Sequence, residues 1–303
     1  MSNSEFRLTT PVAFIIFNRP DTTGEVLERI RKAKPTKLYL ISDAPRAGRE
    51  DDVRLVNETR SLVENGIDWE CEVYKNYAEA NMGCRDRVAS GISWVLEKED
   101  RVIILEDDIV VADDFFRYMQ ETLEYYKDNE RVMMVSGTNL IKDYEIPGDY
   151  AFSCFSGIWG WGTWARAWKH YDVDIKDWPQ IHKSGRFKCV MNGLAYIFLK
   201  RNMDSVYNHV KDTWDIQWDF CRYKYHGLGV VPKHNMVNNI GFGREDATHT
   251  SGESFEDFSY GSMNIPMQYN VEVARDVQYD KAYIKKYFGT RKVMNYIRKK
   301  LHK

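Results

Sequence analysis

Three adjacent carboxylates follow an apolar run in the first half of the chain. Glu106, Asp107 and Asp108 come directly after residues 102–105, which read VIIL. Carboxylates this close repel one another, and a bound cation relieves the repulsion. Hard oxygen ligands suit Mn²⁺ or Mg²⁺, ions that keep positions open for diphosphate oxygens and stabilise a departing nucleoside diphosphate. The triplet therefore predicts a divalent-cation site, with a solvated acidic turn before a helix as the alternative.

Two other polar side chains stand just after apolar runs. Arg19 follows residues 12–17 and could contact a phosphate through its forked guanidinium. Asp43 follows residues 38–41 and could accept a hydrogen bond from a base or a ribose hydroxyl. Each alone is typical of a capping or surface residue. Their joint placement at consecutive strand ends favours a nucleotide pocket.

Residues 81–85 open the helix that is predicted before the acidic triplet. Gly83 permits a close approach of the backbone to a ligand, and Arg85 or Arg87 could lie near a ribose or a phosphate. An ordinary loop and helix start is the alternative.

Tryptophan and glycine alternate in residues 157–164, and aromatic residues make up 14% of the chain. Aromatic rings stack on the flat apolar faces of sugars, and neighbouring glycines let the backbone bend around a ligand. We therefore expect Trp159 or Trp161 to line a sugar site. A tryptophan cluster in the core is the alternative, and it is expected to account for at least one of these rings.

Carboxylates and tryptophans stand together again in residues 212–219, at a predicted helix start. A carboxylate beside an aromatic wall could act as a general base on a sugar hydroxyl. The spacing alone does not select one, and an N-cap is an equally good role for Asp212 or Asp215.

The polar segment 241–256 contains three glycines and is predicted to be a mobile loop. Glycine hinges could let it close over a ligand. Within it, Arg244 could bind phosphate, and His249 could ligate the metal ion or bind diphosphate. A surface loop without such a role is the alternative.

Alternating strands and helices must position these residues. Continuous apolar runs predict buried strands at residues 12–17, 38–41, 102–105 and 132–135, with a more exposed strand at 69–74. Helical spacing predicts helices at about 21–32, 50–64, 86–96 and 113–126, and in the less regular second half at 191–200 and 215–225. Short strands are predicted at 230–231 and 236–240. The alternation implies a mostly parallel, helix-covered sheet whose ligands bind beyond the carboxyl ends of the strands.

Composition narrows the class of protein. The 303 residues are 43% hydrophobic, enough for a core, and the net charge of −2 argues against a protein that coats nucleic acid. The first ten residues lack a secretory pattern, and no apolar run approaches the ~20 residues that span a bilayer. The five cysteines are odd in number and form no CxxC pair, so a reducing cytoplasm is the expected compartment.

The C-terminal segment 280–303 is basic, with nine Lys or Arg residues against one acid, Asp280, a net charge of +8. It also carries apolar residues at helical spacing in two predicted short helices separated by Gly289. One interpretation is a terminal helix packed on the domain with a solvated basic face. The other is peripheral attachment to anionic lipid at the inner membrane surface, near a lipid-linked acceptor.

The chain resembles the GT-A nucleotide-sugar glycosyltransferases in the stretches VAFIIFNRPD, LYLISDAP, VIILEDDIVVADDFFRYM and SGIWGWGTWARAW, and more loosely in WDIQWDF and NNIGFG. In particular it resembles the Golgi N-acetylglucosaminyltransferase that starts complex N-glycan formation, and bacterial relatives of that enzyme. The resemblance spans residues 12–243, and the acidic stretch is its most specific part. It implies a GT-A-like, Rossmann-like α/β fold: a mostly parallel central sheet flanked by helices and an irregular acceptor-binding half. The C-terminal helical tail predicted from the residues themselves completes this fold class.

The resemblance also implies a role for each residue of the donor site. A divalent cation, Mn²⁺ or Mg²⁺, would bind chiefly through Asp108, with Glu106 and Asp107 beside the ribose and the donor sugar. Arg19 would contact the diphosphate, and Asp43 would bind the uracil of a UDP-sugar.

The family inverts the anomeric carbon in one displacement by an acceptor hydroxyl, with a carboxylate as base. Residues 214–219 correspond to the family's segment for that base; Asp215 is the choice here and Asp219 is the alternative. The acceptor would be a glycan or a lipid-linked saccharide. The Golgi members carry a transmembrane anchor, so its absence from this sequence points to a cytoplasmic, bacterial enzyme of polysaccharide biosynthesis.

The predicted organisation has three parts: a nucleotide-sugar-binding half at residues 1–137, an acceptor-binding and catalytic half at 138–265, and a basic amphipathic extension at 266–303. Two other functions compete with the glycosyltransferase. A sugar nucleotidyltransferase would need a glycine-rich phosphate loop after the first strand, and residues 18–21 are not one. A non-catalytic glycan- or nucleotide-binding protein of the same fold would show no metal-linked nucleotide binding.

Overall fold

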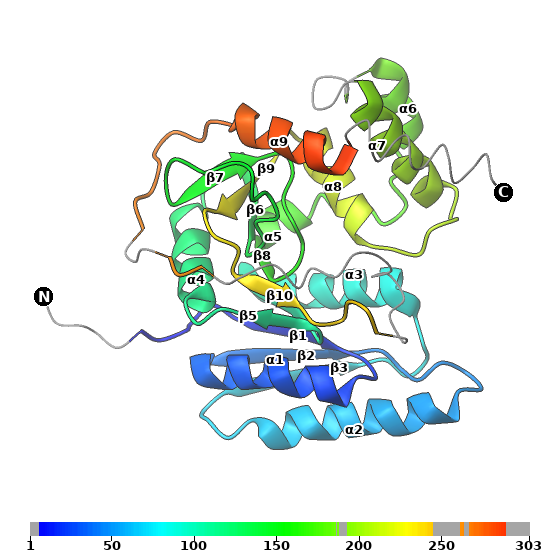
Figure 1. Cartoon of the computed structure of the whole chain (residues 1–303). Coiled ribbons are helices and arrows are strands. Elements are labelled where there is room, and N and C mark those ends of the chain that lie inside the picture. The colour runs from blue at the N-terminus through cyan, green and yellow to red at the C-terminus, as the bar shows by residue number, and fades with distance from the viewer. Residues whose placement is uncertain (1–5, 186, 188–192, 245–260, 264–266, 289–303) are drawn as a thin grey trace, which may run out of the picture.

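An eight-stranded sheet forms the centre of the molecule (Figure 1). The computed structural model describes residues 6–185, 187, 193–244, 261–263 and 267–288. The strands of the sheet are β1 (Val12–Ile16), β2 (Lys37–Ser42), β3 (Glu72–Tyr77), β4 (Arg101–Glu106), β6 (Val132–Ser136), β7 (Tyr150–Ser153), β8 (Trp161–Trp164) and β9 (Leu228–Pro232). They lie in the order β3-β2-β1-β4-β8-β6-β9-β7.

Four neighbouring pairs of this sheet are parallel: β1 with β2, β1 with β4, β2 with β3, and β6 with β9. The pairs β4 with β8, β6 with β8 and β7 with β9 are antiparallel. Strands β1, β2, β3, β4, β6 and β9 therefore all point in one direction. The α/β class with a mostly parallel central sheet, predicted from the alternating apolar runs, is confirmed.

Helices cover both faces of the sheet (Figure 1). They are α1 (Pro20–Ala33), α2 (Glu50–Gly66), α3 (Gly83–Leu96), α4 (Phe115–Tyr125), α5 (Ala165–Trp168), α6 (Trp178–Ser184), α7 (Gly193–Tyr207), α8 (Asp215–Lys224) and α9 (Val277–Phe288). In β1, Val12, Phe14 and Ile16 join the core that includes α1 and α4, whereas Ala13 and Ile15 join the core that includes α3 and α8. A strand buried on both faces explains the continuous apolar runs of the sequence.

A separate antiparallel ribbon pairs β5 (Ile109–Val111) with β10 (Val237–Asn239). Strand β5 begins directly after Asp108, and β10 leads into Gly241. The ribbon therefore brings the acidic triplet and the polar segment that starts at residue 241 together, although they are far apart in the sequence.

Two strands of the sheet had no counterpart among the elements predicted from the sequence. They are β8, in the glycine- and tryptophan-rich region, and β7, which precedes that region in the chain. Gly162 stands inside β8, where a Cβ atom would come within 2.9 Å of Leu123 Cδ1 and 3.0 Å of the Val102 carbonyl oxygen. Glycine thus lets β8 lie close to α4 and β4, and the strand is held by its neighbours rather than by its own propensity.

Strand β3 begins three residues later than the predicted 69–74 segment. Its parallel pairing with β2 aligns Glu72 with Lys37 and Tyr77 with Ser42, and this pairing sets its bounds. The predicted boundary after residue 137 falls within the sheet, between β6 and β7.

The first helix predicted in the basic tail is α9, and its apolar stripe packs on the domain. Tyr279 is buried, and the ring of Tyr283 stacks on Phe155 with 4.8 Å between centroids. The buried carboxylate of Asp280 accepts a hydrogen bond from Ser153 Oγ at 2.5 Å and pairs with Arg275. The helix predicted after Gly289 lies outside the described residues. In the described part of the chain, no helix has both the length and the apolar character needed to cross a membrane.

Candidate functional site

The segments that follow β1, β2 and β4 meet at one edge of the sheet because these strands run in the same direction. Arg19 follows β1, Asp43 follows β2, and the acidic triplet begins with Glu106 at the end of β4. The carboxyl edge of a parallel sheet is where α/β proteins bind their ligands. The residues predicted from the sequence to bind a nucleotide and a cation therefore lie at the same edge of the sheet.

Arg19 and Asp108 form an ion pair at this edge. Arg19 Nη1 lies 3.2 Å from Asp108 Oδ2, and each side chain is only 14% exposed. Burial raises the pKa of Asp108, and the guanidinium of Arg19 lowers it. Gly241 closes over the same carboxylate, since a Cβ atom on Gly241 would come within 2.2 Å of Asp108 Oδ2. Any larger residue at position 241 would displace the carboxylate.

The other two acids of the triplet have different surroundings. One carboxylate oxygen of Asp107 accepts the Phe17 N–H at 3.1 Å, which ties the turn after β4 to the end of β1. Burial, together with the charges of Asp108, Asp107 and Asp215, raises the pKa of Glu106 to about 8.

The triplet fits a cation that takes few protein ligands. Among the described residues, no three His, Cys, Asp or Glu side chains converge as a complete metal cage. Mg²⁺ and similar ions commonly bind through one or two carboxylates and complete their shell with water and substrate phosphates. The largely buried carboxylate of Asp108 suits that kind of site. While no cation is bound, the guanidinium of Arg19 balances its charge.

Asp43 holds the start of α3. Its carboxylate accepts the backbone N–H groups of Met82 at 2.9 Å and Gly83 at 3.0 Å, and the Asn81 side-chain amide at 3.2 Å. The sequence assigned Asp43 to a base or a ribose and gave no sign of these partners. In this structure its oxygens fix the loop beside the site.

Arg85 is turned towards the segment before α8. Its guanidinium contacts Asp86 Oδ1 at 2.8 Å and His209 Nδ1 at 3.1 Å, and its backbone N–H donates to Asp212 Oδ1 at 3.3 Å. The carboxylate of Asp212 thus binds the first turn of α3. An N-cap on α8 was the alternative considered for it from the sequence. Arg87, the alternative to Arg85, is buried and bonds to Asn76.

Asp215, in the second half of the chain, interacts electrostatically with the acidic triplet. It is the first residue of α8, accepts a hydrogen bond from Thr213 Oγ1, and lies near enough for its charge to raise the pKa of Glu106. Asp219, one turn further along α8, is committed to an ion pair with Arg222 at 2.6 Å. Because the Arg222 side chain is fully buried, Asp219 is needed to balance its charge.

The two tryptophans proposed for a sugar site have different environments. Trp161 is a core residue, with no exposed surface and its ring stacked on Trp214 at 5.5 Å between centroids. The prediction that Trp161 could line a sugar site is corrected by this burial. Trp159 is only half-buried, and its ring meets Phe242 edge-on at 5.4 Å.

The segment after β10 passes across the site from Trp159 to α1. Phe242 contacts Trp159, and Arg244 Nη1 pairs with Asp21 Oδ2 at 2.5 Å. The charge of Arg244 also reaches Asp108, where it opposes the rise in pKa that burial causes. His249, predicted as a metal or diphosphate ligand, lies outside the described residues.

One part of the site was missed from the sequence. Asp52, in the first turn of α2, is buried and accepts a hydrogen bond from the Asn18 side-chain amide at 2.8 Å. Arg46 pairs with the same carboxylate at 2.5 Å, and its hydrogen bond lowers the pKa of Asp52 to about 2. Asp52 therefore joins the loop after β1 to the loop after β2. An acid in the first turn of a helix was the only sequence signal, and it is common on surface helices.

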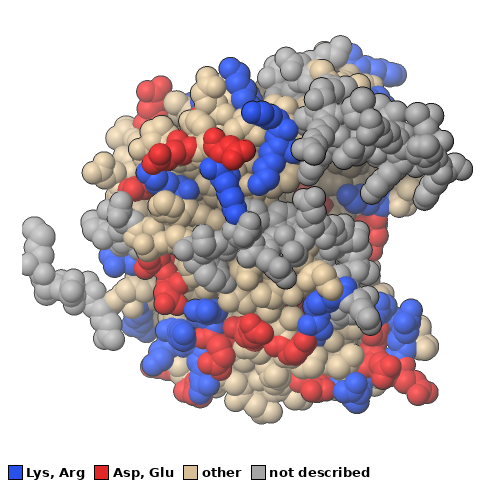
Figure 2. Space-filling model, viewed as in Figure 1, with Lys and Arg blue, Asp and Glu red and all other residues tan. Residues whose placement is uncertain are grey.

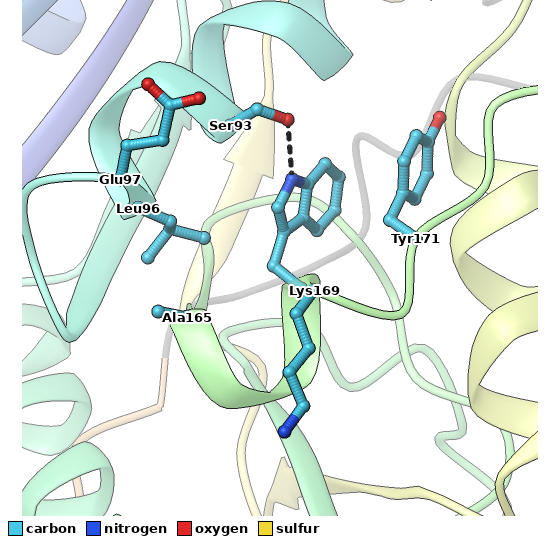
Figure 3. A pocket seen from close by; sticks show the side chains of 7 residues that line it. Ser93, Leu96, Glu97, Ala165, Lys169 and Tyr171 are labelled. Atoms are coloured by element: carbon cyan, nitrogen blue, oxygen red, sulfur yellow. Dashed lines mark hydrogen bonds between the residues drawn. The ribbon is translucent and has the colours of Figure 1, made fainter.

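A depression of about 310 Å³ lies elsewhere, between α3 and α5 (Figure 3). Trp168 forms part of its wall, donates from Nε1 to Ser93 Oγ at 2.9 Å, and stacks on Tyr171. Glu97 and Lys169 stand at its rim. The residues that line it include none of the predicted site residues, so this depression is separate from the candidate site.

The chain matches no protein-family model and no curated protein sequence. Among solved structures it is similar to "Crystal structure of S. aureus TarS 1-349", with a TM-score of 0.35 and 9% identity, over 55% of this chain and 50% of that chain. It is also similar to a UDP-glucose pyrophosphorylase complexed with UDP-glucose, with a TM-score of 0.26 and 8% identity, over 46% of this chain and 68% of that chain. The match thus spans half of the TarS chain. At these TM-scores neither similarity bears on what this chain does, and neither structure is the Golgi enzyme whose motifs the sequence resembles.

Proposed function

We propose that this protein is a metal-dependent, inverting glycosyltransferase that uses a UDP-sugar. The observation that carries the proposal is the largely buried Arg19–Asp108 ion pair at the carboxyl edge of the sheet; Asp215 interacts electrostatically with the same acidic cluster. A cation-binding carboxylate, a phosphate-binding guanidinium and a carboxylate base are what sugar transfer from a nucleoside diphosphate requires.

In the donor complex, Asp108 would hold Mn²⁺ or Mg²⁺ and Arg19 would bind the diphosphate. The cation supplies positive charge that stabilises the departing diphosphate. The ion pair between the two residues keeps both in place and balances their charges before the donor binds. Glu106 and Asp107 stand beside them, where the ribose and the donor sugar are expected.

The transfer step uses the second half of the chain. Asp215 accepts the proton of an acceptor hydroxyl, and the hydroxyl oxygen forms a bond to the anomeric carbon of the donor. The bond from that carbon to the diphosphate oxygen breaks, and UDP leaves with the electron pair. Attack and departure on opposite faces invert the anomeric centre. The half-buried ring of Trp159 offers a stacking wall for a sugar.

The acceptor in this proposal is a glycan or a lipid-linked saccharide. A cytoplasmic location at the inner membrane surface belongs to the same proposal, and it rests on the basic residues of the C-terminal segment.

Donor hydrolysis tests the proposal without knowledge of the acceptor. The full chain is incubated with a panel of nucleotide sugars, with Mn²⁺ or with EDTA, and release of the free nucleotide is measured. We expect slow, Mn²⁺-dependent release of UDP from one or a few UDP-sugars. Equal release with and without metal, or release of a nucleoside monophosphate or triphosphate instead, would contradict a metal-dependent glycosyltransferase.

A further inference from the structure

A second hollow opens at the same edge of the sheet as the acidic triplet. It has a volume of about 480 Å³ and lies beyond the carboxyl ends of β6 and β9, among residues that include Asn139, Tyr144, Lys233 and His234. A volume of this size falls in the range of small-molecule sites, roughly 300–1,000 Å³. No part of the donor site described above lines it, so it can take a ligand while the donor is bound.

Two asparagines make the floor of this hollow rigid. The Asn139 side-chain amide donates to the carbonyl oxygens of Pro232 at 3.0 Å and Lys233 at 2.8 Å. Asn235 Oδ1 accepts the Asn139 N–H at 3.2 Å, and Asn235 Nδ2 donates to the Val237 carbonyl oxygen at 2.6 Å. These bonds lock the two loops together before any ligand arrives, which lowers the entropic cost of binding.

The ribbon of β5 and β10 connects the hollow to the donor site. Asn235 stands two residues before β10, and Gly241, which packs against Asp108, stands two residues after it. Six residues of extended chain cover about 20 Å. A ligand in the hollow is therefore too far away to react, but it can belong to a longer molecule that reaches Asp215.

Two lysines line the hollow. Lys142 is exposed, and Lys233 is partly buried. Among the described residues that line the hollow, the one acid is Glu145, which pairs with Lys233 at 3.3 Å but is itself 84% exposed. An ion pair with so exposed a partner is weak, so a bound anion can replace Glu145 at little cost. Figure 2 shows Lys and Arg side chains interspersed with Asp and Glu side chains over this part of the molecule.

We propose that this hollow, which we call the basic groove, binds an anionic group on the acceptor saccharide, a carboxylate or a phosphate. The inference rests on the proposed glycosyltransferase function and adds the chemical class of the acceptor. Lys142 and Lys233 supply the charge, and the asparagine floor fixes the distance between the two loops that carry them.

The test uses the full chain labelled with ¹⁵N, and the amide signals of residues 233–235 report on the groove. Three probes are titrated separately: methyl glucuronide, which carries a carboxylate; glycerol phosphate, which carries a phosphate; and neutral methyl glucoside. We expect saturable shifts with at least one anion and none with the neutral glucoside. Saturation by the glucuronide alone identifies a carboxylate acceptor, and saturation by glycerol phosphate alone identifies a phosphate-bearing one.

Two variants make the result specific. The double variant Lys142→Ala/Lys233→Ala should weaken the Kd of the anion about fivefold, because each removed charge contributes about 0.5 kcal/mol at such a site. The double variant to arginine should bind like the wild type, which excludes a fold defect as the cause. Lys169→Ala, at the rim of the other depression, is the matched control and should change nothing. No saturable shift with either anion, equal shifts with the neutral glucoside, or unchanged binding by the alanine variant would overturn the proposal.

UDP titrated into the same samples separates this inference from the proposed function. The alanine double variant should bind UDP and Mn²⁺ like the wild type, because the basic groove is not part of the donor site. A wild-type chain that binds UDP but neither anion removes the acceptor class alone. Failure of UDP to bind the wild type removes the proposed function.

Discussion

Arg19 Nη1 lies 3.2 Å from Asp108 Oδ2, between the ends of two neighbouring parallel strands. Each residue is thus paired with an opposite charge that the ligands would replace. Asp108 would exchange Arg19 for a cation, and Arg19 would exchange Asp108 for the diphosphate of the donor. The exchange conserves charge at a site that is largely shielded from water, where an unpaired charge is costly. Donor and metal are therefore expected to bind together more readily than either alone.

Removal of the guanidinium tests that exchange. Arg19→Gln should weaken UDP binding in the presence of Mn²⁺ by about tenfold or more, since a hydrogen bond between charged groups contributes roughly 1.5–3 kcal/mol. Titration calorimetry measures the Kd, and Arg29→Gln serves as the control because Arg29 pairs with the exposed Asp113. An Arg19→Gln variant that binds UDP as tightly as the wild type would exclude Arg19 from the diphosphate site.

The carboxylate of Asp215 is expected to act in the chemical step alone. Asp215→Asn should lower kcat for transfer by about 10²–10⁴-fold, the usual contribution of a general base. The Kd for UDP should stay within about twofold of the wild type. Rapid-quench assays with the donor found by hydrolysis give kcat.

Asp219→Asn provides the comparison for that experiment, because it leaves the buried Arg222 without its partner. We expect the main effect of this variant to be a lower melting temperature in thermal unfolding, rather than a specific loss of the transfer step. If Asp215→Asn transfers sugar normally and a folded Asp219→Asn does not, the base is Asp219.

Asp52 links pH to stability through its low pKa. The hydrogen bond from Arg46 lowers the pKa of Asp52 from 3.8 to about 2, so the folded state binds this proton more weakly than the unfolded chain does. The resulting stabilisation is present above pH 3.8 and disappears as the pH falls towards 2. Asp52→Asn should lower the free energy of unfolding by about 1–2 kcal/mol at pH 7, and by much less below pH 3.

Denaturant titrations at several pH values measure this difference, with the exposed neighbour Asp51→Asn as the control. A deficit for Asp52→Asn that is the same at pH 7 and pH 2.5 would show that the ion pair is not its source.

The two tryptophans predict opposite outcomes. Trp161→Ala removes a fully buried ring and should cost about 3–5 kcal/mol of stability. Trp159→Ala removes a half-buried ring at the site and should raise the KM for the acceptor while the melting temperature changes little. If Trp159→Ala is as destabilising as Trp161→Ala and leaves KM unchanged, Trp159 belongs to the core as well.

The sequence predicts the parallel part of the fold because strands such as β1 are buried on both faces and read as unbroken apolar runs. The placement of Arg19, Asp43 and Asp108 at one edge follows from the common direction of their strands. Strand β8 could not be predicted, since its glycines and tryptophans are ordered by packing against α4 and β4 rather than by local preference.

The hydrogen-bond partners of the site side chains could not be predicted from the sequence either. The amide groups that bind Asp43 come from residues about forty positions away, and Asn18 reaches Asp52 over a similar distance. The local sequence does not distinguish an aspartate that binds groups of the protein itself, such as Asp43 or Asp52, from one that binds a ligand. The burial of Trp161 could not be predicted from the sequence either. Trp161 lies in β8 and is fully buried, whereas Trp159 lies outside that strand and is half-buried.

Metal-linked nucleotide binding tests the central claim most directly. Calorimetry of UDP with the full chain, with and without Mn²⁺, is compared with Asp108→Asn and with the exposed control Asp113→Asn. We predict that Mn²⁺ tightens UDP binding to the wild type and to Asp113→Asn by at least about tenfold, and that Asp108→Asn loses this gain. UDP binding that is equally tight with and without Mn²⁺ in the wild type, or a metal effect that survives in Asp108→Asn, would contradict the account.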